Sequence, residues 1–201
     1  MKIKTIEIAV IVAFVITVIS TVSFENTCQG VREKVLRLHV VANSDSVCDQ
    51  SLKYTVREEI LKDGESIFSG SDTAFKAEEK IRASISFLRE SAENTVRKEG
   101  YDYKVSVNIG RMYFPTRKYE NVTLPAGYYR AVKVIIGEGR GKNWWSVMFP
   151  PMCLPAAKEN NPALDDILSE KENGIVCSAE RYEVRFWIVE KYYEMKKKFI
   201  N

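Results

Sequence analysis

The chain begins with a nearly unbroken run of apolar residues from Ile8 to Val22, with Lys2 and Lys4 before it. A basic flank, an apolar core and small residues at its end are typical of an export signal. The run is shorter than the roughly 20 residues that a membrane span normally needs, which favours a signal peptide over residues 1–24. An uncleaved anchor that holds the chain to a membrane through residues 6–24 stays open. Either alternative places the rest of the chain outside the cytoplasm.

A polar stretch at residues 25–33 is predicted to link this segment to a single domain over residues 34–200. The domain opens with alternating apolar and polar residues over 35–42, which is the period of a half-buried strand. The Asn43-Ser-Asp-Ser46 cluster that follows predicts a turn, with Ser46 as the cap of a helix.

Helical spacing of apolar residues predicts the next two elements. Leu52, Val56 and Ile60 mark one face of a first helix, and Gly64 together with the cluster at 69–72 is predicted to end it. A longer helix then runs to a glycine at position 100. Its apolar face comprises Ala74, Ile81, Ile85, Leu88, Ala92 and Val96.

The period of two returns at residues 103–109, where apolar and polar residues alternate most cleanly. A third strand is predicted over 128–136, after a long connection, and residues 156–173 are expected to form a polar surface segment. A closing amphipathic helix is predicted from five apolar residues, namely Val184, Trp187, Ile188, Met195 and Phe199. This order predicts an α+β fold, with a small antiparallel or mixed sheet packed with helices in a single domain behind the export segment.

The stretch from Gly137 to Cys153 combines three glycines, two cations, paired tryptophans and paired prolines. Such a composition predicts a stiff, shaped loop and marks it as the first place to look for function. If the chain is extended there, Trp144 and Trp145 point in opposite directions, so at least one is expected in the core. Whether the other serves as an anchor for a partner is left open by the pattern.

The glycines of this stretch match neither known phosphate-binding pattern. Three residues, not four, separate Gly137 from Gly141-Lys142, and Asn143 stands where a phosphate loop needs Ser or Thr. The dinucleotide pattern fails in its spacing and in its acidic partner. We therefore expect no nucleotide and no other cofactor.

Composition and charge exclude further classes of function. The chain has 45% hydrophobic and 28% charged residues, as globular proteins do, and its net charge of +3 gives no basic stripe for nucleic acid. The one basic cluster, Lys196–Lys198, is explained by the last turn of a helix. With one histidine and no C-x-x-C pair, we expect no metal site. Four cysteines allow three disulfide pairings, none favoured by the sequence: Cys28, Cys48, Cys153 and Cys177.

An enzymatic alternative depends on a few residues near the first turn. His39 with Cys48 could form a base and a nucleophile, and Asp45 with Asp49 could form an acid and base pair. Helix capping is a sufficient structural reason for the two aspartates. A secreted cell-wall or peptide hydrolase thus stays a second reading, and a septal, membrane-anchored structural protein is a third.

Several blocks of sequence, in the same order, resemble one family. They are Leu36-Arg-Leu-His-Val-Val-Ala-Asn-Ser-Asp-Ser46, Tyr113-Phe-Pro-Thr116, Leu124-Pro-Ala-Gly127-Tyr128 and Gly137-Glu-Gly-x-Gly-Lys-Asn-Trp-Trp-x-Val-x-Phe-Pro-Pro-x-Cys153. Together they are similar to stage II sporulation protein R of endospore-forming Firmicutes, over about residues 31–200.

The resemblance implies a signalling protein that is made in the forespore and exported into the space between the forespore and mother-cell membranes. Its partner would be the membrane-embedded aspartyl protease of the mother cell, whose activation leads to cleavage of the sigma E precursor. The chain itself would then be no enzyme. We expect the partner-binding residues in two patches that follow predicted strand ends: Lys142, Asn143, Trp144 and Trp145, with Asn43, Ser44 and Asp45.

Overall fold

The computed structural model describes residues 2–119, 122–151 and 163–200. Contacts divide the chain into two compact units, each with its own packing. The sheet unit comprises Arg32–Phe114 and Tyr128–Ser169, and the α1 unit comprises Met1–Val31, Pro115–Gly127 and Glu170–Asn201. The sequence pattern alone did not separate these two units.

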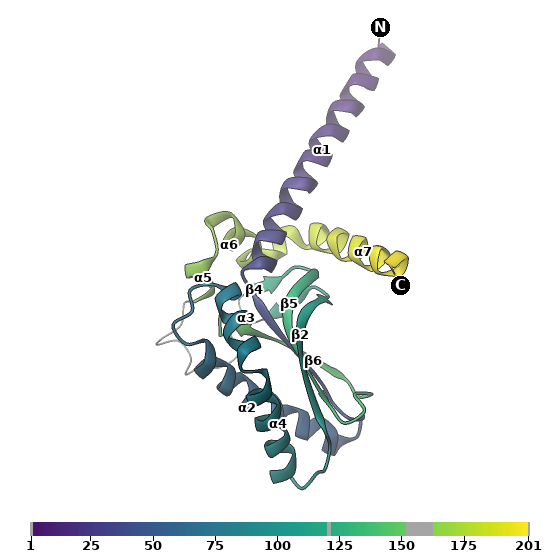
Figure 1. Cartoon of the computed structure of the whole chain (residues 1–201). Coiled ribbons are helices and arrows are strands. Elements are labelled where there is room, and N and C mark those ends of the chain that lie inside the picture. The colour runs from purple at the N-terminus through teal and green to yellow at the C-terminus, as the bar shows by residue number, and fades with distance from the viewer. Residues whose placement is uncertain (1, 120–121, 152–162, 201) are drawn as a thin grey trace. The chain divides into compact units, whose positions relative to one another are not determined.

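The sheet unit is built on four strands in the order β2-β5-β1-β6. The strands are β1 (Leu36–Val41), β2 (Val105–Phe114), β5 (Gly127–Ile136) and β6 (Asn143–Phe149). Strand β1 pairs parallel with β5 and antiparallel with β6, so the sheet is mixed. The predicted α+β class, a small mixed sheet packed with helices, is confirmed (Figure 1).

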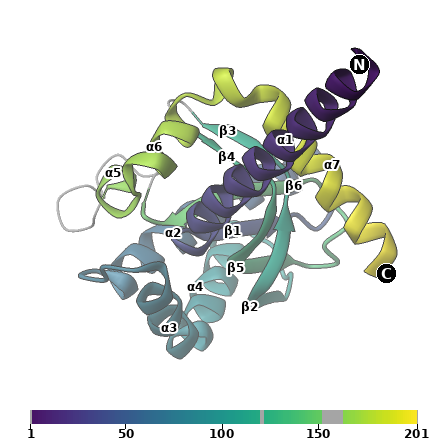
Figure 2. The ribbon, with the colours of Figure 1, turned by 90° about the horizontal axis from the view of Figure 1, so that it is seen from above.

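One face of this sheet is covered by α2 (Val47–Phe68), α3 (Ala74–Ala83) and α4 (Ile85–Lys98), as Figure 2 also shows. Alternate residues of the central strands point into this core, because side chains on a strand alternate between faces. All six of the following are fully buried there: Leu36, Leu38, Val40, Val132, Val134 and Ile136.

The start of α2 follows the prediction, but its end does not. Ser46 caps the helix, and its side chain accepts a hydrogen bond from the Asp49 backbone N–H at 3.1 Å. Gly64, predicted to break the chain, lies inside α2 and is buried. Its missing side chain leaves room for Met148 of β6, whose Cε would lie 2.2 Å from an added Cβ. A contact from a distant strand therefore explains this glycine.

The single long helix predicted for residues 74–96 is two helices, α3 and α4. Ser84 leaves helical geometry with φ −105° and ψ 15°, and its N–H donates to the carbonyls of Lys80 and Ile81. Its own carbonyl accepts from the Leu88 N–H and so begins α4. The predicted apolar face survives this break, since Ile81 and Leu88 are both fully buried.

Strand β6 was not predicted, because its residues were taken as part of a loop. The segment from Asn143 to Phe149 pairs with the whole length of β1. In the long connection before β5, a hairpin of β3 (Arg117–Tyr119) and β4 (Val122–Leu124) was likewise unforeseen. After β6 the chain forms α5 (Leu164–Ile167), so part of the predicted surface segment is helical, and residues 152–162 lie outside the described chain.

A network of ion pairs joins four elements of the sheet unit. The Arg130 guanidinium on β5 bonds Glu33 Oε2 at 2.9 Å and Glu78 Oε2 at 3.1 Å. Arg111 on β2 also pairs with Glu33. Burial would raise the pKa of Glu33, but the hydrogen bonds from Arg130 and Arg111 outweigh it and hold that pKa below its ordinary value. The network ties Glu33 to α3 and to the sheet within this unit.

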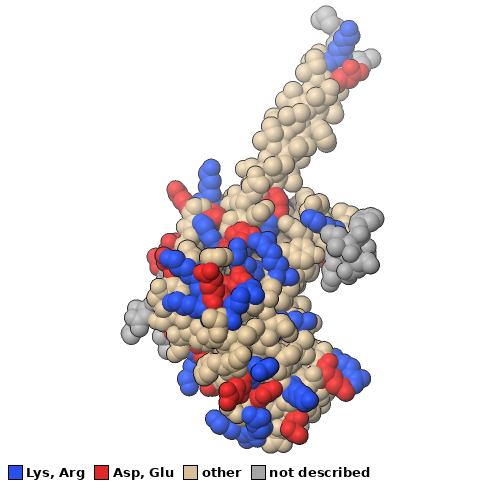
Figure 3. All heavy atoms as spheres, viewed as in Figure 1, with Lys and Arg blue, Asp and Glu red and all other residues tan. Residues whose placement is uncertain are grey.

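In the α1 unit, α1 (Lys2–Glu33) is one continuous helix. Among the described residues it alone is long and apolar enough to cross a membrane, a criterion that an export signal also meets. Figure 3 shows most of its projecting length without Lys, Arg, Asp or Glu, and charged side chains at its tip. The predicted linker at 25–33 is helical, because Phe24, Cys28 and Val31 recur at helical spacing and are all buried.

The α1 unit is completed by α6 (Glu170–Cys177), a 3₁₀ turn over Ala179–Tyr182, and α7 (Glu183–Ile200). The predicted closing helix is thus confirmed, but its buried face is not the predicted one. Phe186 and Val189 are buried, whereas four residues of the predicted face are exposed, namely Val184, Trp187, Ile188 and Met195. The side chain of Phe199 lies outside the described residues.

The core of the sheet unit can be tested with two neighbouring residues of α4. Leu88 is fully buried and Phe87 is 54% exposed. We expect Leu88→Ala to lower the free energy of unfolding by about 2–5 kcal/mol, because it leaves a cavity between helix and sheet. Phe87→Ala should change it by less than about 0.5 kcal/mol. Chemical denaturation of the detergent-solubilised chain measures both, and equal losses would contradict the described packing.

Candidate partner-binding surface

The two patches predicted from the sequence lie side by side at one end of the sheet. Because β1 and β5 are parallel, their carboxyl ends meet at the same edge, and residues 42–46 and 137–142 follow those ends. Backbone hydrogen bonds join the two segments, from Gly141 N to Ala42 O at 3.0 Å and from Arg140 N to Asn43 O at 3.1 Å. We call Asn43–Asp45 and Lys142–Trp145 together the strand-end surface.

The side chain of Asn43 holds the glycine-rich segment in place. Its Oδ1 accepts from the Glu138 N–H at 3.0 Å, and its Nδ2 donates to Asp49 Oδ2 at 3.0 Å. Asp45 acts in the same way, since its Oδ1 accepts from the Lys142 N–H at 2.7 Å. These two predicted contact residues therefore have a structural task within the surface.

Three glycines are needed for this close approach. Gly137 and Gly139 have φ of +57° and +63°, a region that side chains disfavour. Gly141 approaches the other segment most closely, because an added Cβ would lie 2.2 Å from the Ser44 carbonyl oxygen. Backbone geometry thus accounts for the glycines that suggested a phosphate loop.

The buried carboxylate of Asp49 holds the segment Asn43–Asp45 by hydrogen bonds. Asp49 is 4% exposed and accepts from Ser44 Oγ at 2.5 Å as well as from Asn43. The Ser44 hydrogen bond is the largest cause that holds the pKa of Asp49 below its ordinary value, against the effect of burial. Asp49 is therefore ionised at neutral pH and serves as an acceptor.

Lys53 supports the second segment from α2. Its Nζ donates to the Lys142 carbonyl at 3.1 Å and to Gln50 Oε1 at 2.6 Å, and the residue is only 2% exposed. Gln50 in turn donates to the Ser44 carbonyl at 2.8 Å. One turn of α2 therefore binds both halves of the strand-end surface.

The tryptophan pair divides between the two faces of β6, as the extended chain predicted. Trp144 packs against the helical core, edge-on to Tyr54 at 5.1 Å and beneath the Arg57 guanidinium at 4.7 Å. Trp145 lies on the opposite face, 5.9 Å from the His39 ring. Both are half-buried, so neither indole is wholly used by the core.

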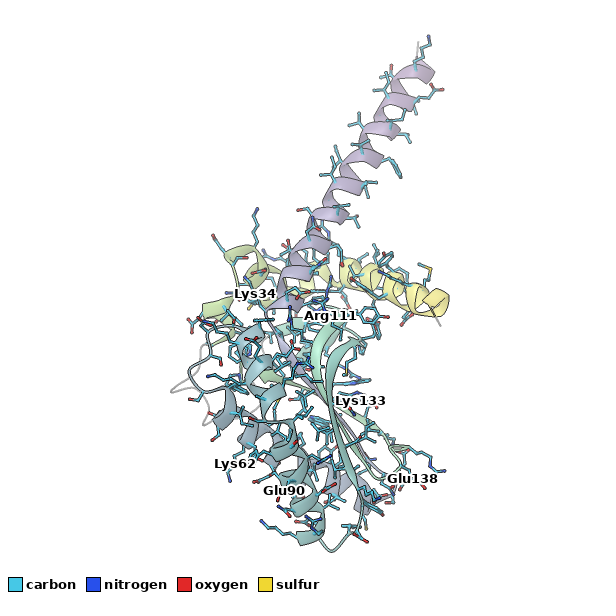
Figure 4. All side chains as sticks on the ribbon, in the orientation of Figure 1. Lys34, Lys62, Glu90, Arg111, Lys133 and Glu138 are labelled. Carbon is cyan, nitrogen blue, oxygen red and sulfur yellow. The ribbon has the colours of Figure 1, made fainter. Side chains whose placement is uncertain are left out.

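His39 supports Trp145 on the face of the sheet opposite the helices. With its Nε2 protonated, His39 donates to Asn143 Oδ1 at 2.7 Å. Burial lowers the pKa of His39; the Asn143 hydrogen bond opposes this effect and nearby Lys133 adds to it. Figure 4 shows Lys133 on this same side of the sheet. His39 is therefore mainly neutral at pH 7 and positions Asn143 and Trp145.

The enzymatic alternatives are not assembled in the described geometry. His39 contacts Asn143 and Trp145, whereas Cys48, in the first turn of α2, contacts Tyr101. The Asp49 carboxylate accepts hydrogen bonds from several neighbouring side chains, and the Asp45 carboxylate accepts one from the Lys142 N–H. Within the described ranges no three His, Cys, Asp or Glu side chains gather as metal ligands. Cys153, the last residue of the predicted stretch, lies outside the described residues.

Exposed groups remain for a partner. Lys142 and Asn143 are exposed, Trp145 is half-exposed, and Glu138 and Arg140 form an ion pair on the adjoining loop. Figure 4 shows Glu138 at the tip of that loop. Moreover, β6 is an edge strand of the described sheet. Sequence reasoning missed this edge, and it missed Glu138 and Arg140, although both stand inside the stretch it selected.

The contact between the two segments can be tested at Gly141. An alanine there would press against the Ser44 carbonyl, so Gly141→Ala should lower the free energy of unfolding by about 1–3 kcal/mol. Gly110→Ala is the matched control, because no atom lies within 4 Å of its added Cβ. Chemical denaturation compares the two. A neutral Gly141→Ala would show that the segments are not held together.

The role of Asp49 predicts a dependence of stability on pH. Its pKa is lowered on folding, so its stabilising effect is complete above the unfolded value of about 3.9 and is lost as pH falls through the folded pKa. Asp49→Asn should lower the free energy of unfolding at pH 7 by about 1–3 kcal/mol. The variant should also lose less stability than the original chain as pH falls into the acid range. If it loses stability just as steeply, Asp49 is not the carboxylate responsible.

Comparisons with known proteins identify the family of this chain. The family described as stage II sporulation protein R matches residues 32–159, which include the whole strand-end surface. A protein of Bacillus subtilis (strain 168), named stage II sporulation protein R, is 30% identical over 186 residues, 83% of each chain. No solved structure is significantly similar to this chain. The chain therefore belongs to the stage II sporulation protein R family.

Proposed function

We propose that this chain is an exported signal of sporulation that activates the membrane-embedded aspartyl protease of the mother cell. Membership of the family supports a role in sporulation. The apolar α1 is compatible with export from the forespore into the space between the two membranes. Activation of the protease then leads to cleavage of the sigma E precursor, and the chain itself performs no chemistry.

The observation that carries the proposal is the strand-end surface. It presents a rigid backbone edge beside one half-exposed indole and one exposed cation, Trp145 and Lys142. Tryptophan in a fixed position is among the side chains that contribute most to protein interfaces. Asn43 and Asp45 accept hydrogen bonds from backbone N–H groups of this surface, and Lys53 donates one to a carbonyl. These bonds hold the surface before any partner arrives, which lowers the entropy lost on binding.

The edge strand β6 suggests how the protease would be recognised. An extended segment of the protease can add to the outer edge of β6 and pair with its backbone groups. Trp145 would then pack against that segment on one face, while Lys142 selects an acidic residue of it. The backbone pairing provides affinity, and the two side chains provide specificity.

The decisive test is cleavage of the sigma E precursor in non-sporulating cells that produce the protease and this chain. Trp145→Ala should reduce cleavage by roughly 10-fold or more, since a central interface residue contributes about 2 kcal/mol. Lys142→Glu should also reduce it, and the bonds of Lys142 with Asp45 and Lys53 are made by its backbone, which the substitution keeps. Phe87→Ala, an exposed aromatic on α4, is the control and should leave cleavage unchanged.

The amount of folded, exported chain is measured for each variant. Full cleavage with both Trp145→Ala and Lys142→Glu would overturn the strand-end surface as the binding site. Loss of cleavage only in variants that fail to fold would assign Trp145 to the core. The hydrolase alternative predicts instead that His39→Gln together with Cys48→Ser abolishes activity.

A further inference from the structure

Helix α7 carries two apolar faces, of which the α1 unit buries only one. Phe186 and Val189 are 4% and 5% exposed and pack with Phe24 and Cys28 of α1. The other face recurs at helical spacing and is solvent-exposed by 44–70%: Val184, Ile188, Tyr192 and Met195. A contiguous exposed face of this kind marks a surface that binds something.

Contacts with α1 fix the position of α7 along that helix. The Phe24 and Phe186 rings meet edge-on at 5.5 Å, and the Tyr193 hydroxyl donates to Glu25 Oε1 at 2.8 Å. These contacts come directly after Val22, the last residue of the long apolar run. Figures 1 and 2 show α7 crossing this part of α1 instead of running along it. Helix α7 therefore lies where the apolar surface of α1 ends.

A cavity of about 540 Å³ shows which side of α7 faces the apolar part of α1. On the α1 side its lining changes from apolar to hydroxyl-bearing, with Ile16, Ile19, Ser20, Ser23 and Thr27. Across from them stand Lys171 and Arg185, and the described lining includes no carboxylate. Ile188 and Tyr192 follow Arg185 by three and seven residues, so they share its side of the helix.

The opposite edge of α7 is acidic. Glu183 and Glu190 line a separate cavity with Lys118 and Thr123 of the β3–β4 hairpin. The helix thus has Arg185 with Ile188 and Tyr192 on the side toward α1. Its other edge carries Glu183 and Glu190, together with the exposed ring of Trp187. This division matches a helix lying in a membrane interface, where cations meet lipid phosphates and aromatic rings lie at headgroup level.

We propose that the Val184–Met195 face of α7, with Lys171 and Arg185, binds the phospholipid surface of the membrane that α1 enters. Continuity favours lipid over a protein partner in the chain that keeps α1, because Arg185 of α7 lines a cavity with α1, and α1 is long and apolar enough to cross a membrane. The cations bind anionic headgroups, and the apolar side chains lie at the acyl boundary. This membrane contact holds the α1 unit on the bilayer and is independent of protease activation.

The test is photocrosslinking of the full chain in vesicles of phosphatidylglycerol and phosphatidylcholine. The photoreactive residue benzoylphenylalanine replaces Ile188 or Tyr192, and it replaces Glu190 as the matched control on the acidic edge. Lipid adducts, counted by mass spectrometry, should be several-fold more frequent at the first two positions. Equal adduct frequencies at all three positions, or crosslinks between two copies of the chain, would overturn the proposal.

A second experiment tests the two cations of the proposed site. Lys171→Gln combined with Arg185→Gln should lower the adduct yield at Ile188 in phosphatidylglycerol vesicles and leave it unchanged in pure phosphatidylcholine. Both side chains are exposed, but the Arg185 guanidinium also lies over the Phe24 ring at 5.7 Å, so near-ultraviolet circular dichroism must show that the variant keeps the Phe24 and Phe186 packing. An unchanged yield in the anionic vesicles would remove these cations from the site.

Discussion

The parallel pairing of β1 with β5 is the constraint on which the candidate surface depends. It brings two segments, separated by almost a hundred residues, to one edge of the sheet. Once they are there, two polar side chains of the first segment bond backbone groups of the second. Asn43 and Asp45 accept from the N–H groups of Glu138 and Lys142, and the ionised Asp49 fixes Asn43 from below. The polar side chains that suggested an active site are therefore used in hydrogen bonds within the fold.

Because these polar side chains bond within the fold, other groups are left exposed on a surface suited to binding a partner. Its exposed components are a cation, a half-exposed indole and the backbone of an edge strand. His39 supports the indole in a mainly neutral state, since burial lowers its pKa. Rigid support beneath a few exposed groups is what a binding signal requires.

Local sequence periods predicted the elements whose packing follows from their own residues. The alternation in β1 and β2 and the helical faces around Leu88 and Val56 are of this kind. Elements decided by distant contacts were missed or misjudged. Gly64 was taken as a breaker because Met148 of β6 could not be foreseen, and β6 itself was hidden behind its glycine-rich approach. In α7 both faces are apolar, so periodicity could not say which one α1 would bury.

The central claim is that the chain acts as an activating ligand from outside the mother-cell membrane. The most direct measurement is cleavage of the sigma E precursor in non-sporulating cells that contain the protease, with the full chain and with a chain lacking residues 1–23. The account predicts cleavage that needs both the exported chain and the catalytic aspartate of the protease. Cleavage by the leaderless chain in the cytoplasm, or with an inactive protease, would contradict it.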